Sequence, residues 1–352
     1  MTMAGNLQIG IFDHMDRGPL PLARQYEDRL RLAELYDRFG FDRLHIAEHH
    51  STPLGTAPSP GIFLSAVAQR TRRLRLGALV YPIKLYHPLR LAEEIAMLDH
   101  LSNGRLEFGV GKGASPIELS LYGVNPADAE PQFAEALNVV MQALTQDSVD
   151  FAGKFYNFRD VPVTMRPLQQ PLPPMWYGVS RPDGAARAAR AGYNIVGNLP
   201  ATMARDVTGA YRAAWAEAGR DIAALPRLGI GRFVVVADND SEARALAARA
   251  FPRWQSSFWA LWDARGERPP VPMPDTFEGV ERMGIGVAGS PRTVADTLSA
   301  QLDEAEANYL LGRFAFGDLG FEDAARSVEL FAREVMPALK GETPTAPLSV
   351  TA

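Results

Sequence analysis

Residues 74–113 read LRLGALVYPIKLYHPLRLAEEIAMLDHLSNGRLEFGVGKG and carry a clear pattern of secondary structure. Apolar runs over 74–81 and 106–111 predict two short strands. Between them, apolar side chains recur at the spacing of one helix face over 88–101, with Glu93 and Glu94 facing outward. These apolar residues are Leu89, Ala92, Ile95, Ala96 and Leu98. The stretch therefore predicts a strand, a helix and a second strand, which is the repeating unit of parallel α/β folds.

The alternation of strand and helix continues on both sides of this stretch. Further strands are predicted over 6–12, 43–48, 175–180, 193–197, 230–237 and 309–316. Further helices are predicted over 22–39, 60–71, 131–146, 183–191, 203–219, 240–263 and 321–338, and Pro337 is expected to stop the last of them. Eight strand-then-helix units favour a parallel sheet, and eight such units can close as a (β/α)8 barrel. An open, doubly wound sheet is the alternative.

Two segments are longer than the minimal alternation requires. We expect insertions near 147–174, which ends in the proline-rich RPLQQPLPP, and near 264–292. Long segments of this kind are often lids, binding loops or oligomer contacts, and 264–292 is expected to close over a site. The last residues, 341–352, are rich in Pro and Thr and predict a disordered tail. Residues 1–340 are then expected to form a single barrel domain.

The composition excludes several classes of function. The 352 residues are 47% hydrophobic, which suits a globular protein with a large core, and they contain no cysteine. Disulfides, thiolate metal sites and thiol nucleophiles are therefore excluded. The net charge of −5 argues against a nucleic-acid partner. Neither a signal peptide nor a membrane span is predicted, so we expect a cytoplasmic protein.

The run HIAEHH, residues 45–50, holds three of the six histidines. His45 and His49 match a pattern of zinc peptidases, in which they would lie one helical turn apart. The surrounding sequence predicts a strand followed by a Pro/Gly-dense loop instead. On a strand the two Cα atoms would be about 13 Å apart, too far for a shared zinc with bonds of about 2.1 Å. We therefore expect no metal site, and expect His45 to be structural.

Glu48, His49 and His50 then follow the carboxyl end of a strand. In an α/β barrel this end carries the active site, so these three are the candidate catalytic residues. A single histidine there would more often be structural, but three successive polar groups favour a role in a pocket.

Small residues and candidate anion sites occur at other strand ends. Gly77 and Ala78 lie within a predicted strand and suit either close approach of a flat ligand or tight packing. Backbone N–H groups and a cation suited to phosphate are offered by Lys112, Gly113 and Ser115. A second anion site is possible where Ser180, Arg181 and Gly184 lead into a predicted helix, although an ordinary helix cap is the simpler explanation. Together these features predict a pocket for a phosphorylated, flat cofactor.

The order of these motifs resembles the bacterial-luciferase-like family of flavin-dependent oxidoreductases. The resemblance covers most of residues 6–340 and rests on 40–50, 74–113, 289–298 and 327–339. It implies a (β/α)8 barrel that binds FMN, or in one branch the deazaflavin F420. It also implies phosphate binding near Lys112, Ser180, Arg181 and Gly184. A cis peptide against the flavin ring maps to Gly77–Ala78.

The same resemblance implies a function. Reduced FMN from a separate flavin reductase would react with O2 at its C4a atom, next to His49, to oxygenate a small organic substrate. The alternatives are an F420-dependent reductase or dehydrogenase, and a non-catalytic subunit of a heterodimeric flavoenzyme. A homodimer is also implied. Luciferase has a reactive cysteine at the position of Gly111, so light emission is not expected of this chain.

Overall fold

In the computed structural model, which describes residues 7–113, 115–268 and 273–342, eight parallel strands form a closed barrel. The strands follow the order β1-β2-β3-β4-β7-β8-β9-β11, and pairing of β11 with β1 closes the ring. Their bounds are β1 Gln8–Asp13, β2 Arg43–Ile46, β3 Arg75–Pro82, β4 Leu106–Gly111, β7 Met175–Gly178, β8 Asn194–Gly197, β9 Leu228–Val236 and β11 Tyr309–Arg313. The predicted barrel is confirmed, and the open sheet is excluded.

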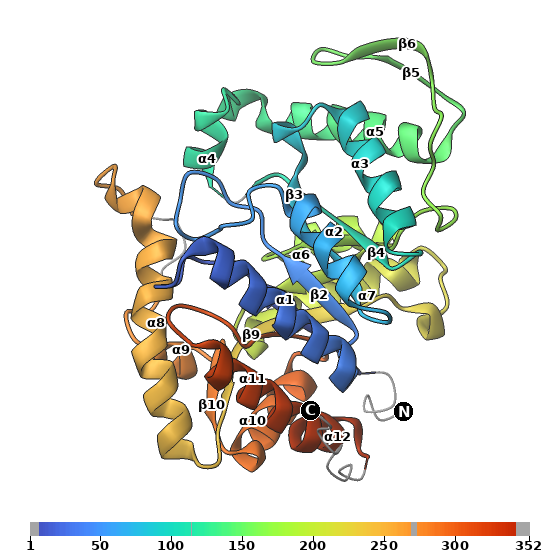
Figure 1. The fold of residues 1–352 in the computed structure, drawn as a ribbon. Helices are drawn as coiled ribbons and strands as arrows, with labels where there is room; N and C mark the ends of the chain where they lie inside the picture. The colour runs from blue at the N-terminus through green and yellow to red at the C-terminus, as the bar shows by residue number, and fades with distance from the viewer. Residues whose placement is uncertain (1–6, 114, 269–272, 343–352) are drawn as a thin grey trace.

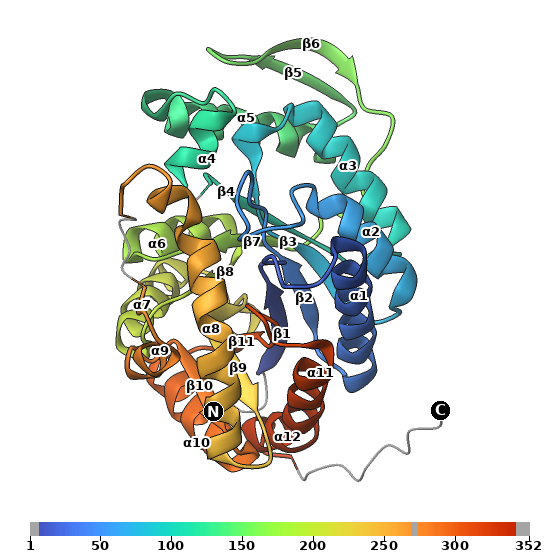
Figure 2. The ribbon, with the colours of Figure 1, turned by 60° about the vertical axis from the view of Figure 1, so that its left-hand side comes forward.

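Helices surround the barrel on its outside (Figures 1 and 2). The long ones are α1 Leu22–Phe39, α2 Pro60–Arg70, α3 Pro88–Leu101, α5 Ala129–Thr145, α6 Pro182–Ala191, α7 Ala201–Glu217, α8 Asp240–Asp263, α10 Pro291–Glu304 and α11 Phe321–Leu330. Among the described residues, no helix combines the length and apolarity that crossing a membrane requires.

The boundaries of these elements follow from local sequence. Gly40 ends α1 with φ 78°, a left-handed conformation in which glycine avoids the steric cost of a Cβ atom. Pro88 begins α3 at the first turn, where its missing N–H is harmless. Glu93 faces outward as predicted, but Glu94 is half-buried and lies against Gly61 of α2. The carboxyl group of Glu94 therefore lies in the contact between α2 and α3.

The segment 264–292 contains a helix, α9 (Phe277–Arg282), and a ninth strand, β10 (Gly286–Gly289), which pairs with the end of β9. Phe277, Val280 and Ile285 are buried in a core that also includes α8 residues. The expectation that this whole segment closes as a lid is therefore wrong for 277–289, because its apolar side chains are part of the folded core. Residues 269–272 lie outside the described part of the chain.

The segment 147–174 contains an antiparallel hairpin, β5 (Ser148–Ala152) and β6 (Asn157–Pro162). Both ribbon views show it projecting from the barrel beside α5 (Figures 1 and 2). Between β4 and α5 lies a short helix, α4 (Pro116–Leu121), which carries two residues of the site described below, Glu118 and Leu119. The predicted tail, 341–352, lies outside the described residues from 343 onward.

Candidate active site

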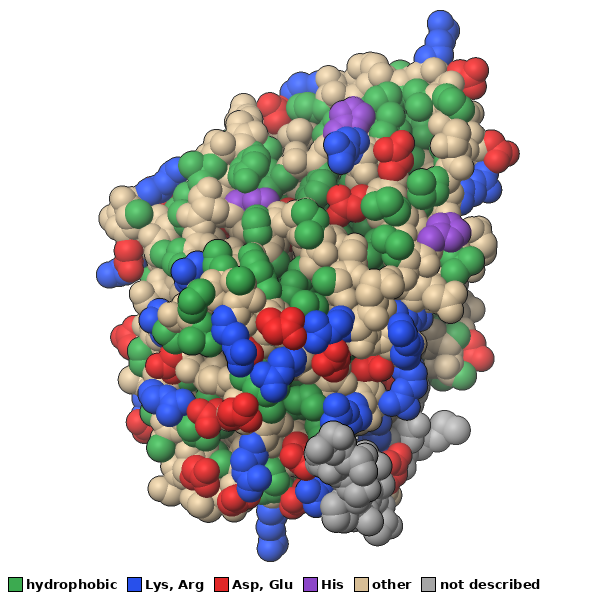
Figure 3. Space-filling view, in the orientation of Figure 1, with side chains coloured by type: hydrophobic (Ala, Val, Ile, Leu, Met, Phe, Trp, Pro, Cys, Tyr) green, Lys and Arg blue, Asp and Glu red, His purple; other side chains and the backbone are tan. Residues whose placement is uncertain are grey.

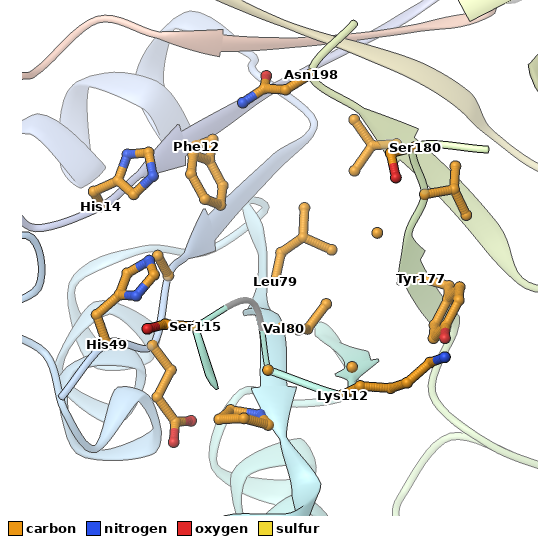
Figure 4. Close-up of a pocket in the computed structure, with 18 of the residues that line it drawn as sticks. Phe12, His14, His49, Leu79, Val80, Lys112, Ser115, Tyr177, Ser180 and Asn198 are labelled. Atoms are coloured by element: carbon orange, nitrogen blue, oxygen red, sulfur yellow. The ribbon is translucent and has the colours of Figure 1, made fainter. Parts of the chain in front are cut away.

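A cavity of about 560 Å³ opens at the carboxyl ends of the barrel strands. Residues in or directly after seven of the eight barrel strands line it, and Phe258 of α8 adds to its wall. Figure 4 shows His14 and His49 on one side, Tyr177, Ser180 and Lys112 on the other, and Leu79 and Val80 between them. This is the face of a barrel on which active sites are built.

His49 lies in the cavity wall, in the loop after β2. Its Nδ1 atom is 3.0 Å from Oε1 of Glu118, which lies on α4. The other carboxylate oxygen of Glu118 accepts the backbone N–H of His50 at 2.8 Å. When Glu118 is ionised, it accepts the Nδ1 hydrogen of His49, so that Nε2 of His49 is left as an acceptor. Nε2 makes no hydrogen bond within the described residues, and so remains available to a ligand.

His50 and Glu48 form a second network, which the backbone N–H of His50 joins to Glu118. Nε2 of His50 lies 2.9 Å from Glu48, and Nδ1 lies 3.0 Å from the hydroxyl of Tyr122. Tyr86 donates to the second oxygen of Glu48 at 2.6 Å. Burial raises the pKa of Glu48, and its hydrogen bonds with His50 and Tyr86 act against that shift. Glu48 lines the cavity, whereas His50 does not, and both ring nitrogens of His50 are engaged within this network.

His14, which no sequence motif singled out, lies beside His49 on the same side of the cavity. The two rings stack at 5.9 Å, and Trp254 donates from its indole N–H to Nδ1 of His14 at 3.3 Å. Burial, followed by the charges of Arg313 and His49, lowers the pKa of His14 well below its ordinary value. A neutral His14 that accepts at Nδ1 carries its hydrogen on Nε2, and is therefore a donor there.

The non-prolyl cis peptide lies at Leu79–Val80, and the predicted position at Gly77–Ala78 is wrong by two residues. Leu79 and Val80 line the cavity, whereas Gly77 and Ala78 do not. A Cβ atom on Gly77 would lie 2.1 Å from the carbonyl oxygen of Glu107, so this glycine serves the close contact between β3 and β4. Tight packing, the alternative considered for these small residues, is what the structure shows.

Only some residues of the two predicted anion-binding loops line the cavity. Lys112, Gly113, Ser115 and Ser180 line it. Arg181 points to solvent beside Asp183, and Gly184 is buried within α6. Lys112 is ion-paired with Glu130 at 2.5 Å, and the side chains are 37% and 69% exposed, respectively. Exposed pairs contribute little free energy, so Lys112 can exchange this partner for a ligand anion.

The middle of the cavity suits a flat ring system. Apolar side chains form its walls, namely Leu79, Val80, Val179, Val196 and Leu311. Gly178 contributes backbone only, and a Cβ atom added there would meet nothing within 4 Å, because it would point into open space. With the polar groups of Lys112, Ser115 and Ser180 in its wall, the cavity fits a flat cofactor that carries an anionic group.

His45 lies below the cavity and is fully buried in the barrel. Its ring packs edge-on against Trp176 at 4.9 Å. Burial lowers the pKa of His45 to about 4, although Glu107 acts against this shift. Neither ring nitrogen has a hydrogen-bond partner in the described residues. His45 and His49 thus lie in different environments, and the described residues contain no cluster of three or more side chains suited to a metal ion.

Sequence reasoning missed three residues that shape the site: His14, Glu118 and Arg313. His14 follows β1 as His49 follows β2, so its position after a strand was a usable signal. Glu118 reaches His49 only because α4 folds over the loop after β2, which no local pattern indicates. Arg313 ends β11 and is 4% exposed. A buried arginine cannot be recognised from the alternation of strand residues alone.

Comparisons with known proteins agree with this geometry. A model of the luciferase-like monooxygenase family matches residues 7–308. The chain is 31% identical over 328 residues to 4-hydroxyprotoasukamycin monooxygenase of Streptomyces nodosus subsp. asukaensis, covering 89% of this chain and 86% of that protein. It is 26% identical over 347 residues to the oxygenase component of flavin-dependent trigonelline monooxygenase of Acinetobacter baylyi, covering 94% and 95%.

A solved structure is similar over nearly its whole length. The monooxygenase RslO1 of Streptomyces bottropensis matches with a TM-score of 0.84 and 27% identity, covering 94% of this chain and 99% of that one. The chain therefore belongs to the luciferase-like monooxygenase family.

Proposed function

We propose that this chain is the oxygenase component of a two-component flavin monooxygenase. It would take reduced FMN from a separate reductase and use O2 to oxygenate a small organic substrate. The observation that supports this most is His49, held at Nδ1 by Glu118 with Nε2 open to an apolar cavity. The relative from Acinetobacter baylyi, described as a flavin-dependent oxygenase component, supports the division between two proteins.

Different residues of the cavity would bind different parts of the cofactor. Lys112, Ser115 and Ser180 would bind the phosphate, and Leu79 and Val80 would contact the flat ring. Reduced FMN, when bound, supplies two electrons, so that one atom of O2 enters the substrate and the other leaves as water. The apolar walls exclude solvent from this chemistry.

The two histidines on one side of the cavity have complementary roles in this proposal. His14 donates a hydrogen bond from Nε2, because it is neutral and accepts from Trp254 at Nδ1. His49 holds or delivers a proton at Nε2, because Glu118 stabilises the positive charge that forms on its ring. An oxygen atom that leaves as water needs such a proton.

The experiment combines the purified chain with a flavin reductase, FMN and NADH. Oxygen uptake is measured across a panel of ketones, terpenes, sulfonates and aromatic acids under ¹⁸O2. We expect one ¹⁸O atom in the product, and a loss of about 10² to 10³ in turnover in His49→Gln. The control is His87→Gln, because His87 is exposed and does not line the cavity.

Two alternatives give different results in this assay. An F420-dependent reductase or dehydrogenase would transfer a hydride without O2, so it would show no ¹⁸O product but would turn over with F420. A non-catalytic subunit would show undiminished turnover of its complex after His49→Gln. Either outcome would overturn the proposed monooxygenase activity of this chain.

A homodimer is part of the proposal. Ile62 on α2 and Met97 and Leu101 on α3 are exposed apolar side chains on neighbouring helices. Figure 3 shows hydrophobic side chains gathered on the part of this face that carries α2 and α3, and charged ones crowding the part below. Light scattering of the purified chain tests this, with twice the mass of 38.5 kDa expected.

A further inference from the structure

Arg313 places a buried cation at the cavity. It is the last residue of β11, is 4% exposed, and contributes to the cavity lining. The rings of Phe12 and Phe233 flank its guanidinium, with centroids 4.9 and 4.7 Å from Cζ. These rings stabilise the positive charge through their faces, but they accept none of the strong, directional hydrogen bonds that its N–H groups offer.

The charge of Arg313 has no counter-charge among the described residues. Within the part of the chain that the structure describes, no ion pair or hydrogen bond to a protein group includes Arg313, and its Nε and Nη1 atoms are buried without a partner. The charged group coupled to it is Arg232, another buried arginine, which has the same sign. Burial and then Arg232 lower the pKa of Arg313 to about 9, so it remains protonated at neutral pH. Burying a cation without a partner costs free energy, unless a bound anion pairs with it.

The position of Arg313 separates it from the predicted phosphate loops. Three strands, β1, β2 and β3, lie between β11 and β4 in the barrel, so Arg313 and Lys112 lie on opposite walls. Asn198, after β8, lies near Arg313, because both side chains approach the same side of Gly231. Asn198 also lines the cavity (Figure 4). The cavity therefore offers a cation and an amide at the wall opposite Lys112.

We propose that Arg313, with Asn198 beside it, forms a second anion-binding subsite of the cavity, for a planar oxyanion such as a carboxylate or an enolate-type oxygen. A guanidinium presents its N–H groups in a fixed plane, which matches the two oxygens of a carboxylate. The inference rests on the proposed function only for the source of that oxyanion, which is either the organic substrate or the reduced flavin ring. Its binding chemistry does not depend on turnover.

The test uses benzoate as the probe and benzamide, its uncharged analogue of similar shape. Binding to the purified chain is measured by calorimetry for wild type, Arg313→Lys and Arg313→Met. We expect wild type to bind benzoate at least tenfold more tightly than benzamide, Arg313→Lys to retain part of this preference, and Arg313→Met to lose it. The control is Arg292→Met, since the side chain of Arg292 is 92% exposed.

Thermal unfolding separates a ligand subsite from a structural role. Arg313→Met removes an unpaired buried charge, so its ligand-free form should be at least as stable as wild type, and benzoate should no longer raise its Tm. A preference for benzoate that survives Arg313→Met, equal binding of benzoate and benzamide by wild type, or a large loss of Tm in Arg313→Met would each overturn the proposal.

Binding measurements with FMN distinguish the two sources of the oxyanion, which are the organic substrate and the reduced flavin ring. If the substrate supplies the oxyanion, benzoate binds equally well to FMN-loaded protein, and Arg313→Met leaves the affinities for oxidised and reduced FMN unchanged. If the reduced flavin supplies it, FMN displaces benzoate, and Arg313→Met weakens binding of reduced FMN more than that of oxidised FMN. Either result supports the subsite and names its ligand. A chain that binds benzoate through Arg313 but consumes no O2 would refute the proposed function alone.

Discussion

At the scale of single residues, the site depends on charges whose partners lie far away in the sequence. His49 and Glu118 are 69 positions apart, and their contact forms only when α4 packs over the loop after β2. The sequence could therefore place His49 at a strand end, but it could not say which of His49 and His50 faces the cavity. Buried carboxyl groups are equally hard to foresee, because an isolated Asp in a loop is usually exposed.

Asp16 is such a buried carboxyl group, in the loop after β1. Its Oδ2 atom accepts the backbone N–H of Gly317 at 2.8 Å, and its Oδ1 atom has no partner in the described residues. Burial raises its pKa from 3.8 to about 7. The folded chain thus holds this proton more tightly than the unfolded chain. The stabilisation is complete below about pH 4 and is lost as the pH rises through 7.

Asp16→Asn keeps the acceptor for Gly317 but cannot ionise. We expect its free energy of unfolding, relative to wild type, to rise between pH 5 and pH 8 by up to about 3 kcal/mol, two pKa units at about 1.4 kcal/mol each. Urea unfolding at both pH values measures this. The matched control is Asp296→Asn, whose side chain is 75% exposed. A difference from wild type that is the same at both pH values would contradict a raised pKa.

At the scale of elements, hydrophobic periodicity predicted most of the fold. It gave α1, α3 and α8 with their observed bounds, and it gave all eight barrel strands. It missed β10, because four residues containing two glycines carry no strand signal, and it did not assign the helix α10 (Pro291–Glu304). Pro337 was wrongly expected to stop the last helix. It instead lies in the first turn of α12 (Met336–Lys340), which follows a five-residue π-helical segment and tolerates a missing N–H.

Substitution of Phe277 tests whether α9 belongs to the hydrophobic core or acts as a lid. It is 2% exposed and packs against Phe251 and Phe316, with ring centroids 6.0 and 6.1 Å apart. We expect Phe277→Ala to lower the free energy of unfolding by about 3 to 5 kcal/mol, because it leaves a cavity in the core. Ile222→Ala, at a residue 62% exposed, is the control and should cost under about 0.5 kcal/mol. An unchanged stability with altered turnover would indicate a lid instead.

At the scale of the whole molecule, a buried charge network joins strands across the barrel interior. Glu107 on β4 is fully buried and accepts from Arg43 of β2 at 2.8 Å, from Arg75 of β3 at 2.5 Å, and from the indole of Trp176 on β7. Burial alone would raise the pKa of Glu107, but the two arginines outweigh it and lower that pKa. The sequence could not reveal this network, since the order of strands around the ring decides which charges meet.

Glu107→Ala would leave the Arg43 charge in the interior without its carboxylate. We expect a loss of about 3 to 5 kcal/mol in the free energy of unfolding, which is typical when one partner of a buried ion pair is removed. Denaturant unfolding followed by circular dichroism measures it, with Glu278→Ala, an exposed partner of Arg282, as control. A loss no larger than that of the control would mean that the network contributes little to barrel stability.

The central claim is that the cavity at the strand ends holds reduced FMN, and anaerobic titration tests it most directly. Reduced FMN and reduced F420 are each titrated into wild type and into Gly178→Leu. Gly178 lines the cavity, and a Cβ atom added there would lie more than 4 Å from the other described residues apart from its chain neighbours. The account predicts that wild type binds reduced FMN and not F420, and that Gly178→Leu has the Tm of wild type but binds FMN at least tenfold more weakly. Equal FMN affinity in both proteins, or binding of F420 alone, would contradict it.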